Sequence, residues 1–499
     1  MNRRNFLRSS IAAGVGAALP ASQIYAAMHS LTTPYSDIVG VSGSGDEVVM
    51  AQDAVQNLSD SLRGNLLLPG NDGYDKARLL LNKSFDKHPA LVVQPSGVVD
   101  VQHAVNFARE HDLLVAVKCG GHSHSGKSSC DNGMQIDLST LRHVRIDADS
   151  RSAFVAGGSL LGEMDRESMA FGLVTTAGTV SHTGVGGLAL GGGFGRVGRR
   201  FGLALDNVKS VDVVTADGQL RQASAEENPD LYWGLRGGGG NFGVVTAFEF
   251  ALHPMQRQVF GGDILFPISM ARDFLKFYGE FCQSAPDDLY CDGLLVSPEG
   301  SPEGMCGVHV CCSGPAGKVD EVLAPVRKLG KPIADTVAAI DYVELQRASD
   351  NLDPRVGGEY FKGGFVNEIP DSLAEKVADG FDLDPGRATI AYFQHSGGAI
   401  GRVAAEATAF PHRRCIANMF IAINWPEDAD PVRHIDYIRS YWKTLETSTD
   451  GYYTNDTGDE PQPMINANYQ VNFDRLLKLK NQYDSGNLFR LNANIKPTA

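Results

Sequence analysis

Three glycine-dense stretches, each next to an apolar segment, constrain this 499-residue chain more than any other feature. They read VAVKCGGHSHSG at 115–126, GTVSHTGVGGLALGGGFG at 178–195 and GGGGNFG at 237–243. Glycine has no Cβ and adopts positive φ easily, so the backbone of such loops can approach a ligand closely. The 56 glycines cluster in this way, which indicates loops that contact a ligand rather than a flexible linker.

The segments around the first and second stretches alternate between strand and helix patterns. Apolar residues recur at helical spacing after Asp100, which we expect to be the N-cap, and 231–235 also reads as helical. The β-α-β order around the first of these helices predicts a parallel pair of strands. Strands are predicted at 89–93, 113–117, 134–138, 143–146, 153–157, 208–214 and 244–250.

Two kinds of cofactor are compatible with the glycines. Gly184-x-Gly186 opens a dinucleotide fingerprint of the nicotinamide type, but no clear strand precedes it and Ala189 stands at the third glycine position. We expect the glycines here to continue instead of giving way to a helix, which that fingerprint requires. A flavin with its pyrophosphate fits better, because backbone N–H groups of several loops can bind that anion.

The middle of the chain changes character after Pro254. Strand-like and helical segments alternate there without glycine loops, which predicts an α+β sheet domain that supplies a wall for a substrate. Near the C-terminus, Phe473, Leu476 and Leu477 form a helical apolar stripe that we expect to pack back on the first domain. On that C-terminal helix, Arg475, Lys478 and Lys480 are predicted to point outward. In the middle of the chain the predicted strands are 261–266, 289–297, 307–312 and 417–423, and the predicted helices are 319–329, 372–380 and 434–447.

Charge and cysteine content exclude several classes of protein. The net charge of -15 argues against sequence-independent nucleic-acid binding and against binding to anionic membranes. The eight cysteines show no zinc-site spacing, and for so long a chain they do not read as a disulfide framework. We expect mostly free, buried thiols and no metal, with a Cys282–Cys291 bridge left open.

Residues 1–27 read as a targeting segment. Arg3 and Arg4 precede a weak apolar stretch, and Tyr25-Ala26-Ala27 offers a cleavage site, as in a twin-arginine export signal. The alternatives are an ordinary secretory signal or a membrane anchor, but the apolar run is too short for a stable membrane span. The sequence therefore predicts export, with a periplasmic or secreted protein. Residues 28–60, which lack strong periodicity, read as an N-terminal extension.

In their order along the chain, several motifs resemble those of one family. The chain is similar to a bacterial member of the berberine-bridge-enzyme-like oxidoreductases, within the vanillyl-alcohol-oxidase type of flavoproteins. The resemblance runs from about Leu62 to Pro497. Its features are Gly120-Gly121-His122, GVGG…GGGFG, Asp206-Asn207, Trp233-Gly234 through Gly243, Tyr360-Phe361-Lys362, Gly397-Gly398-Ala399, Ala409 to Arg413, Tyr453-Thr454-Asn455, and Asn487-Leu488-Phe489 with Asn492-x-Asn494.

The resemblance implies an α+β fold: a PCMH-type FAD-binding domain of two α/β subdomains, plus an antiparallel-sheet substrate domain backed by helices. The implied division is 61–253 for the FAD-binding domain, 254–452 for the substrate domain, and 453–499 for a berberine-bridge-like segment that returns to the FAD domain. The implied activity is FAD-dependent oxidation of an alcohol, sugar or secondary metabolite, with oxygen or another electron acceptor. A flavin-binding sensing or storage protein without turnover and, less favoured, an NAD(P)-dependent dehydrogenase are the alternatives.

The resemblance also implies roles for individual residues. His122 matches the histidine that is bonded to the flavin 8α-methyl, and Val180 stands where many relatives have a second attachment through cysteine, so we expect a single bond. Leu188 replaces a histidine of several relatives. The remaining implied FAD contacts are Gly120, Gly121, Ser123, Gly178, Thr179, Gly184, Gly186, Gly187, Gly191, Gly192, Asn207, Gly240, Gly243, Val244, Asn455, Asn492 and Asn494.

Tyr453 is the predicted catalytic base, because it matches the tyrosine of the Tyr-x-Asn segment. A tyrosine with an ordinary pKa of roughly 10 is a poor base at neutral pH, so a neighbouring cation would have to stabilise the phenolate. The alternative is a hydrogen-bonded residue of the cavity wall.

Overall fold

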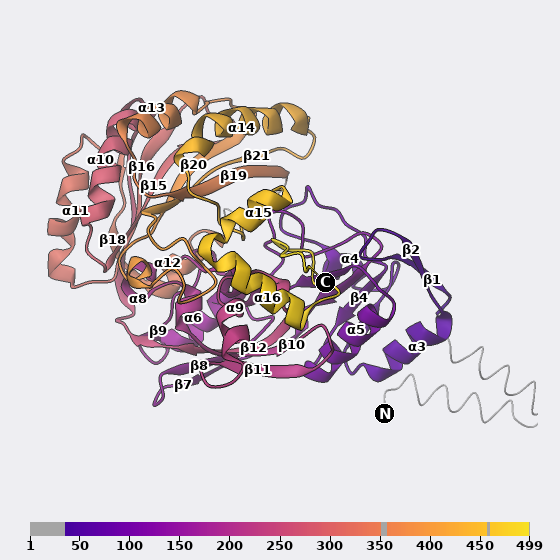
Figure 1. The fold of residues 1–499 in the computed structure, drawn as a ribbon. Coiled ribbons are helices and arrows are strands. Elements are labelled where there is room, and N and C mark those ends of the chain that lie inside the picture. The colour runs from indigo at the N-terminus through magenta and orange to yellow at the C-terminus, as the bar shows by residue number, and fades with distance from the viewer. Residues whose placement is uncertain (1–34, 351–356, 457–459, 499) are drawn as a thin grey trace, which may run out of the picture.

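The computed structural model describes residues 35–350, 357–456 and 460–498, so the predicted targeting segment at 1–27 lies outside the described residues. The N-terminal half forms the lower part of the molecule in Figure 1, and the middle of the chain forms a large sheet above it. The C-terminal helices α15 (Gln462–Asn468) and α16 (Phe473–Tyr483) lie across the lower part. This arrangement of sheets and helices confirms the predicted α+β fold class.

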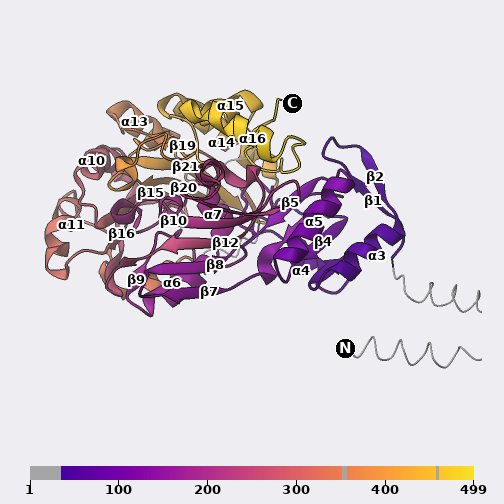
Figure 2. The same cartoon turned by 60° about the horizontal axis from the view of Figure 1, so that its bottom comes forward.

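The first subdomain is a four-stranded sheet of order β3-β4-β6-β5, which lies with α4 and α5 at one end of the molecule (Figure 2). The strands that flank α5 are parallel as predicted, but each pairs with β6, which lies between them. Leu91, Val93, Val105 and Ile136 are among the side chains of its core. The elements are β3 (Asn65–Leu67), α4 (Tyr74–Arg78), β4 (Leu91–Gln94), α5 (Val98–Glu110), β5 (Val115–Lys118) and β6 (Met134–Asp137).

Asp100 does not cap α5 from outside, because the helix already begins at Val98. Its buried carboxylate accepts hydrogen bonds from the backbone N–H groups of Ser96, Arg63 and Gly64, at 2.8, 3.0 and 2.9 Å. These bonds hold the pKa of Asp100 below its usual value despite its burial. The predicted N-cap is therefore wrong in position, although the carboxylate still satisfies the backbone at the helix start.

Regular elements precede this subdomain, although 28–60 shows no strong periodicity. They are β1 (Ile38–Val41), β2 (Glu47–Met50) and α3 (Gln52–Ser61). Met50, Val55 and Leu58 join the core of the four-stranded sheet. These elements are short, which explains why their periodicity is hard to read from the sequence.

The second subdomain is an antiparallel sheet of order β11-β10-β12-β8-β7. The expectation that the glycines after Gly184 do not give way to a helix is wrong, because α7 begins at Val185. Val185, Ala189 and Leu190 bury one face of this helix, which stabilises it despite its glycines. The elements are β7 (Val144–Asp147), β8 (Ser152–Ala156), α6 (Leu161–Met169), β9 (Leu173–Val174), α7 (Val185–Gly191), α8 (Gly198–Phe201), β10 (Val208–Val214), β11 (Leu220–Ser224), α9 (Pro229–Leu235), β12 (Val244–Ala251) and β13 (His253–Pro254).

The middle of the chain forms an antiparallel sheet of order β17-β14-β16-β15-β20-β21-β19, with β18 beside β14. Helices α10, α11, α13 and α14 cover its outer face (Figure 1). Along β20, Ala391 and Phe393 pack under these helices, while Ile390 and Gln394 face the opposite way, toward the N-terminal half. The elements are β14 (Gln258–Pro267), α10 (Ala271–Ser284), β15 (Leu289–Ser297), β16 (Met305–Cys312), α11 (Val319–Arg327), β17 (Ala334–Asp335), β18 (Ala338–Asp341), α12 (Tyr342–Arg347), β19 (Gly358–Val366), α13 (Asp371–Gly380), β20 (Ala388–His395), β21 (Ala417–Trp425) and α14 (Pro431–Leu445).

The C-terminal helix α16 packs against the second subdomain, where Leu476 and Leu479 join its core. Lys480 does not point outward as predicted. Its side chain is fully buried, and Nζ donates to the Asp484 carboxylate at 2.7 Å and to the backbone carbonyls of Phe489 and Asn241 at 2.9 and 3.0 Å. The helical period was read correctly, but it could not reveal that the following loop folds over Lys480.

Lys480→Ala is expected to lower the free energy of unfolding by about 3–5 kcal/mol, because it leaves the buried Asp484 carboxylate without its cation. Lys478→Ala is the matched control on the exposed side of the same helix, and it should change stability by less than about 0.5 kcal/mol. Urea unfolding of the two variants checks the difference. Equal midpoints would show that Lys480 is dispensable for the fold.

All eight cysteines are free in the structure, so the Cys282–Cys291 bridge does not form. Seven of them are buried and Cys119 is half-buried. No helix of the described ranges is both long and apolar enough to cross a membrane. Within the same ranges, no group of histidine, cysteine and acidic side chains could hold a metal ion.

Candidate active site

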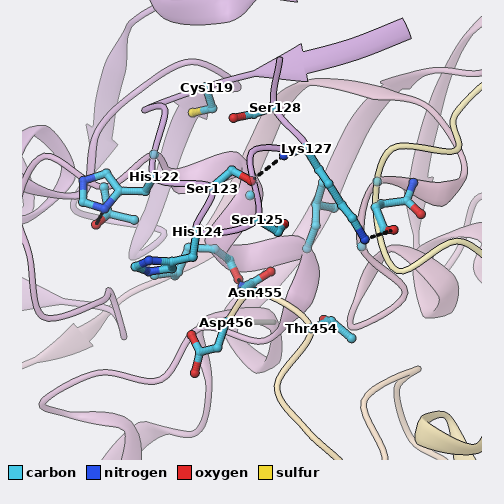
Figure 3. Close-up of a pocket in the computed structure, with 18 of the residues that line it drawn as sticks. Cys119, His122, Ser123, His124, Ser125, Lys127, Ser128, Thr454, Asn455 and Asp456 are labelled. Carbon is cyan, nitrogen blue, oxygen red and sulfur yellow. Dashed lines mark hydrogen bonds between the residues drawn. The ribbon is translucent and has the colours of Figure 1, made fainter. Parts of the chain in front are cut away.

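A cavity of about 530 Å³ lies between the glycine loops and the inner face of the large sheet. Its size is typical of a small-molecule site. All three glycine stretches contribute to its wall, as do β19, β20 and β21 and the segment from Tyr453 to Asp456. Figure 3 shows His122 and His124 from one loop beside Asn455 and Asp456 from the C-terminal segment.

Most residues predicted to contact the cofactor meet in this cavity. Those that line it are Gly120, Gly121, His122, Ser123, Gly178, Thr179, Gly184, Gly186, Gly187, Gly240, Gly243, Tyr453, Asn455 and Asn492. Those outside its lining are Gly191, Gly192, Asn207, Val244 and Asn494.

Gly191, the last residue of α7, and Gly192 directly after it are not part of the cavity lining but contact residues that are. A Cβ on Gly191 would lie 2.2 Å from Asn455 Oδ1, and a Cβ on Gly192 would lie 2.8 Å from the Tyr453 ring. Both distances are too short for real contacts, so glycine at these positions lets the C-terminal segment reach the cavity. These two glycines leave the space that the side chains of Tyr453 and Asn455 occupy.

Asn207 has a structural role. Its Nδ2 donates to the carbonyls of Phe201 and Leu203 at 3.0 and 2.9 Å, and its Oδ1 accepts from His253 Nε2 at 2.6 Å. These bonds fix the turn before β10, outside the cavity. Val244 is buried in the core at the start of β12.

Open space and unsatisfied polar atoms beside the cavity fit a large polar group. A Cβ added at Gly187, Gly239 or Gly240 would meet nothing within 4 Å, and all three residues line the cavity. Ser128 Oγ and Asn492 Oδ1 are buried there without a hydrogen-bond partner among the described residues. Buried polar atoms of this kind are costly unless a ligand or water satisfies them. The residues present therefore fit an extended cofactor with polar atoms along its length, as FAD has.

The first and second glycine stretches touch through their backbones. A Cβ on Gly120 would lie 2.3 Å from Gly184 N, and a Cβ on Gly184 would lie 2.4 Å from Gly120 N. Only glycine at both positions permits this approach. The contact holds His122 next to residues 182 and 183.

His122 reaches both of these neighbours through its ring. Its Nε2 lies 2.6 Å from His182 Nδ1, and its Nδ1 lies 3.4 Å from Thr183 Oγ1. His182 does not line the cavity, whereas His122 and Thr183 do. Sequence reasoning missed His182, since a partner 60 residues away carries no local pattern.

Cys119 is the one cysteine among the described residues of the cavity wall. Its Sγ donates to the Gly157 carbonyl at 3.1 Å, and burial raises the pKa of the thiol to about 11. A thiol held protonated in this way is a poor nucleophile. Val180, which the resemblance places at the position of a second attachment, also lines the cavity.

The Tyr453 hydroxyl is held by two donors, Gly193 N at 2.7 Å and Asn455 Nδ2 at 2.8 Å. Burial nevertheless raises the pKa of Tyr453 above its usual value, and the charge of Asp456 raises it further. The cation that a catalytic phenolate requires is not among these partners. The electrostatics favour the alternative in which Tyr453 is a hydrogen-bonded wall residue.

Asp456 is a second titratable group of the wall, and sequence reasoning did not single it out. Its Oδ2 accepts from Asn418 Nδ2 of β21 at 2.7 Å. Burial raises the pKa of Asp456 to about 6, and nearby Glu359 also raises it, while His124 and the Asn418 bond lower it. A carboxyl group with a pKa near neutrality suits acid–base catalysis. Its one sequence cue is that it directly follows the Tyr-Thr-Asn segment.

Glu359 and His124 lie at the same end of the cavity. His124 Nδ1 is 3.4 Å from the Glu359 carboxylate, and its ring meets Phe361 edge to face with centroids 4.7 Å apart. Phe420 of β21 lines the wall beside Phe361. This end therefore combines acidic groups with aromatic rings, whereas the opposite end is built from glycine backbone.

Comparison with known proteins gives two family matches within the chain. Residues 89–224 match the FAD binding domain, and residues 459–496 match the berberine and berberine-like domain. An FAD-linked oxidoreductase of Dictyostelium discoideum is 32% identical over 455 residues, which cover 90% of this chain and 98% of that protein.

Solved structures share the fold over nearly the same length. The crystal structure of 6-hydroxy-D-nicotine oxidase from Arthrobacter nicotinovorans matches with a TM-score of 0.79 and 26% identity, covering 87% of this chain and 98% of that chain. A xylooligosaccharide oxidase from Myceliophthora thermophila, in complex with xylobiose, matches with a TM-score of 0.80 and 23% identity, covering 89% and 99%. The second likeness concerns the fold alone.

Proposed function

Because the chain belongs to the berberine-like FAD-linked oxidoreductases, we propose that it oxidises an alcohol, a sugar or a secondary metabolite with an FAD attached through one bond to His122. The observation that carries the proposal is the position of His122. It stands in the wall of a cavity whose cofactor side consists of the glycine stretches and whose other side is the inner face of the large sheet.

The chain's own residues would bind and orient the cofactor. Gly187, Gly239 and Gly240 leave room beside the backbone, and Ser128 Oγ and Asn492 Oδ1 offer hydrogen bonds. When bound, FAD supplies a two-electron acceptor that takes hydride from a substrate carbon. The protein must then remove a proton from the adjacent O–H or N–H.

For that proton we propose Asp456 rather than Tyr453. Asp456 lines the cavity, and its Oδ2 accepts a hydrogen bond from Asn418, beside His124 and Glu359. With a pKa of about 6, Asp456 is mostly ionised at neutral pH and can accept a proton. Tyr453 would instead stay protonated and support the wall.

The test of the proposed function is the wild-type protein after acid precipitation. A yellow pellet, and a tryptic peptide around His122 that carries the mass of FAD, would support covalent attachment. Anaerobic bleaching of the flavin by one member of a panel of alcohols, sugars and amines would then establish turnover, and peroxide formation in air would identify oxygen as acceptor. A colourless pellet would refute the bond.

The alternatives predict other outcomes of the same experiment. A covalent flavin that no electron donor of a broad panel can bleach would favour a sensing or storage protein. A colourless protein that binds NAD(P) would favour the NAD(P)-dependent dehydrogenase.

Export remains part of this proposal and rests on the sequence alone. The precursor with Arg3 and Arg4 should reach the periplasm or the medium of a bacterial host through the twin-arginine pathway, which carries folded, cofactor-loaded proteins. Replacing both arginines by lysine should leave the precursor in the cytoplasm, measured by cell fractionation. Export of that variant at the wild-type level would contradict the assignment.

A further inference from the structure

His182 contacts His122 but is not among the residues that line the cavity. The two imidazole rings have centroids 4.7 Å apart and are tilted by 36°, and His122 Nε2 lies 2.6 Å from His182 Nδ1. His182 is not part of the cavity lining, so it has no place in contact with a substrate. Its short hydrogen bond to His122 needs another explanation.

The segment around His182 is fixed by backbone hydrogen bonds. Leu161 N donates to the Thr183 carbonyl at 2.9 Å, and Gly162 N donates to the Ser181 carbonyl at 2.8 Å, so both neighbours of His182 are tied to the start of α6. On its other side, Gly184 is pressed against the backbone of Gly120. The relative position of the two histidines is therefore set by the fold.

A neutral imidazole has one N–H and one nitrogen with a lone pair, and the hydrogen bond at one nitrogen decides which is which. We propose that His182 is a positioning residue for flavin attachment: it accepts the Nε2–H of His122 and so keeps the lone pair on Nδ1. This inference rests on the proposed function, in which that lone pair forms the bond to FAD. Thr183 Oγ1, 3.4 Å from Nδ1, is too distant to set the tautomer by itself.

The atoms and electrons of the attachment balance with dioxygen as oxidant. A C–N bond forms between His122 Nδ1 and the 8α carbon, and one C–H bond of the methyl group breaks. The methyl proton and the Nε2 proton are released, and the two electrons of the C–H bond remain on the cofactor. Dioxygen then takes up the two electrons and two protons and becomes hydrogen peroxide.

His182 has a distinct task in this sequence. As Nδ1 bonds to carbon, the imidazole of His122 would gain positive charge, and the hydrogen bond to His182 lets the Nε2 proton leave. Once the bond exists, Nε2 carries the lone pair, and His182 can turn from acceptor to donor. The imidazole of His182 can do both, because its tautomer can change.

The test follows attachment in apoprotein produced under riboflavin limitation and then mixed with FAD in air. Samples are acid-precipitated at intervals, and bound flavin is measured by in-gel fluorescence and by peptide mass. For His182→Ala we expect noncovalent FAD binding with attachment slowed about 100-fold, the lower range for loss of one acid–base partner. For His182→Asn, whose Oδ1 can occupy the place of Nδ1, we expect partial recovery.

Thr183→Val is the comparison variant, since it removes a second polar neighbour of the His122 ring and should slow attachment much less than His182→Ala does. Thermal melts of each apoprotein separate a folding defect from a chemical one, and His182→Asn decides the matter if His182→Ala does not fold. Attachment at the wild-type rate in whichever variant folds without an imidazole at 182 would overturn the inference. If the wild type itself gains no covalent flavin, the proposed attachment fails instead, so the two failures are distinguishable.

Discussion

His122→Ala is expected to abolish covalent flavin entirely while leaving a folded protein that binds FAD weakly. The glycine walls and the polar atoms at Ser128 and Asn492 remain in this variant, so the cofactor still has a site. The pellet after acid precipitation should be colourless and the supernatant yellow. Without the bond the flavin should also be a weaker oxidant, so substrate reduces it more slowly, and the cofactor can escape by dilution.

The matched control is His124→Ala. His124 lies on the same loop and lines the same cavity, but it pairs with Glu359 rather than His182. It should retain full covalent attachment, measured by the same pellet and by peptide mass. The result that would contradict the assignment is covalent FAD in His122→Ala, and the peptide that carries it would show whether the Cys119 thiol had taken over despite its raised pKa.

The strands were predictable because they are apolar and bounded by glycine or charged turns. The segment 289–297 was read to the residue as β15, and 208–214 as β10. β15 is buried over nearly its whole length, whereas β10 combines buried valines with more exposed polar residues. Periodicity could not predict which strands pair. β4 and β5 directly precede and follow α5 along the chain, yet β6 lies between them in the sheet.

Short helices and buried charges were harder, for a physical reason. The glycine-rich helix α7 has low intrinsic helix propensity, and it is stabilised by the burial of Val185, Ala189 and Leu190 in the second subdomain. Lys480 looks like an outward residue of an amphipathic helix until the loop with Asp484 and Phe489 closes over it. In each case a tertiary contact overrides the local preference.

Some residues of the candidate site could likewise be predicted from the sequence, and others could not. Residues in recognisable motifs, such as Gly120, His122 and Asn455, could be placed at the cavity from the sequence. His182 and Glu359 could not, because each acts through a partner that is distant along the chain: 60 residues in one case and 235 in the other. Motifs locate the groups that touch the cofactor better than the groups that control them.

The two ends of the cavity therefore have different origins and different chemistry. The cofactor end is backbone and glycine, which fits a shared cofactor. The substrate end presents Asp456, Glu359 and His124 among aromatic rings on strands of the large sheet. We expect substitutions at that end to affect the substrate more than flavin binding, and the proposed proton acceptor lies there.

Asp456→Asn should reduce the rate of flavin reduction by about 10²–10⁴-fold with any donor that bleaches the wild-type flavin, because the amide cannot accept the substrate proton. The pH profile gives the sharper test. In the wild type, kcat/KM should fall about tenfold per pH unit below a pKa of about 6, where Asp456 becomes protonated, and level off above it. Burial raises this pKa, Glu359 raises it further, and His124 and Asn418 lower it. Because Asp456 is the proposed titrating group, the acidic limb should disappear in Asp456→Asn.

Tyr453→Phe is the comparison that separates the two candidate bases, because it removes the hydroxyl held by Gly193 and Asn455 but leaves Asp456 in place. We expect it to keep the acidic limb and to lose at most about tenfold in rate, as for a wall residue whose hydrogen bonds are lost. Stopped-flow reduction under anaerobic conditions measures both variants without the reoxidation step. A nearly inactive Tyr453→Phe beside a nearly unchanged Asp456→Asn would identify Tyr453 as the base. The bound cofactor or substrate would then have to supply the cation or dipole that stabilises the phenolate, because the described neighbours of Tyr453 do not supply one.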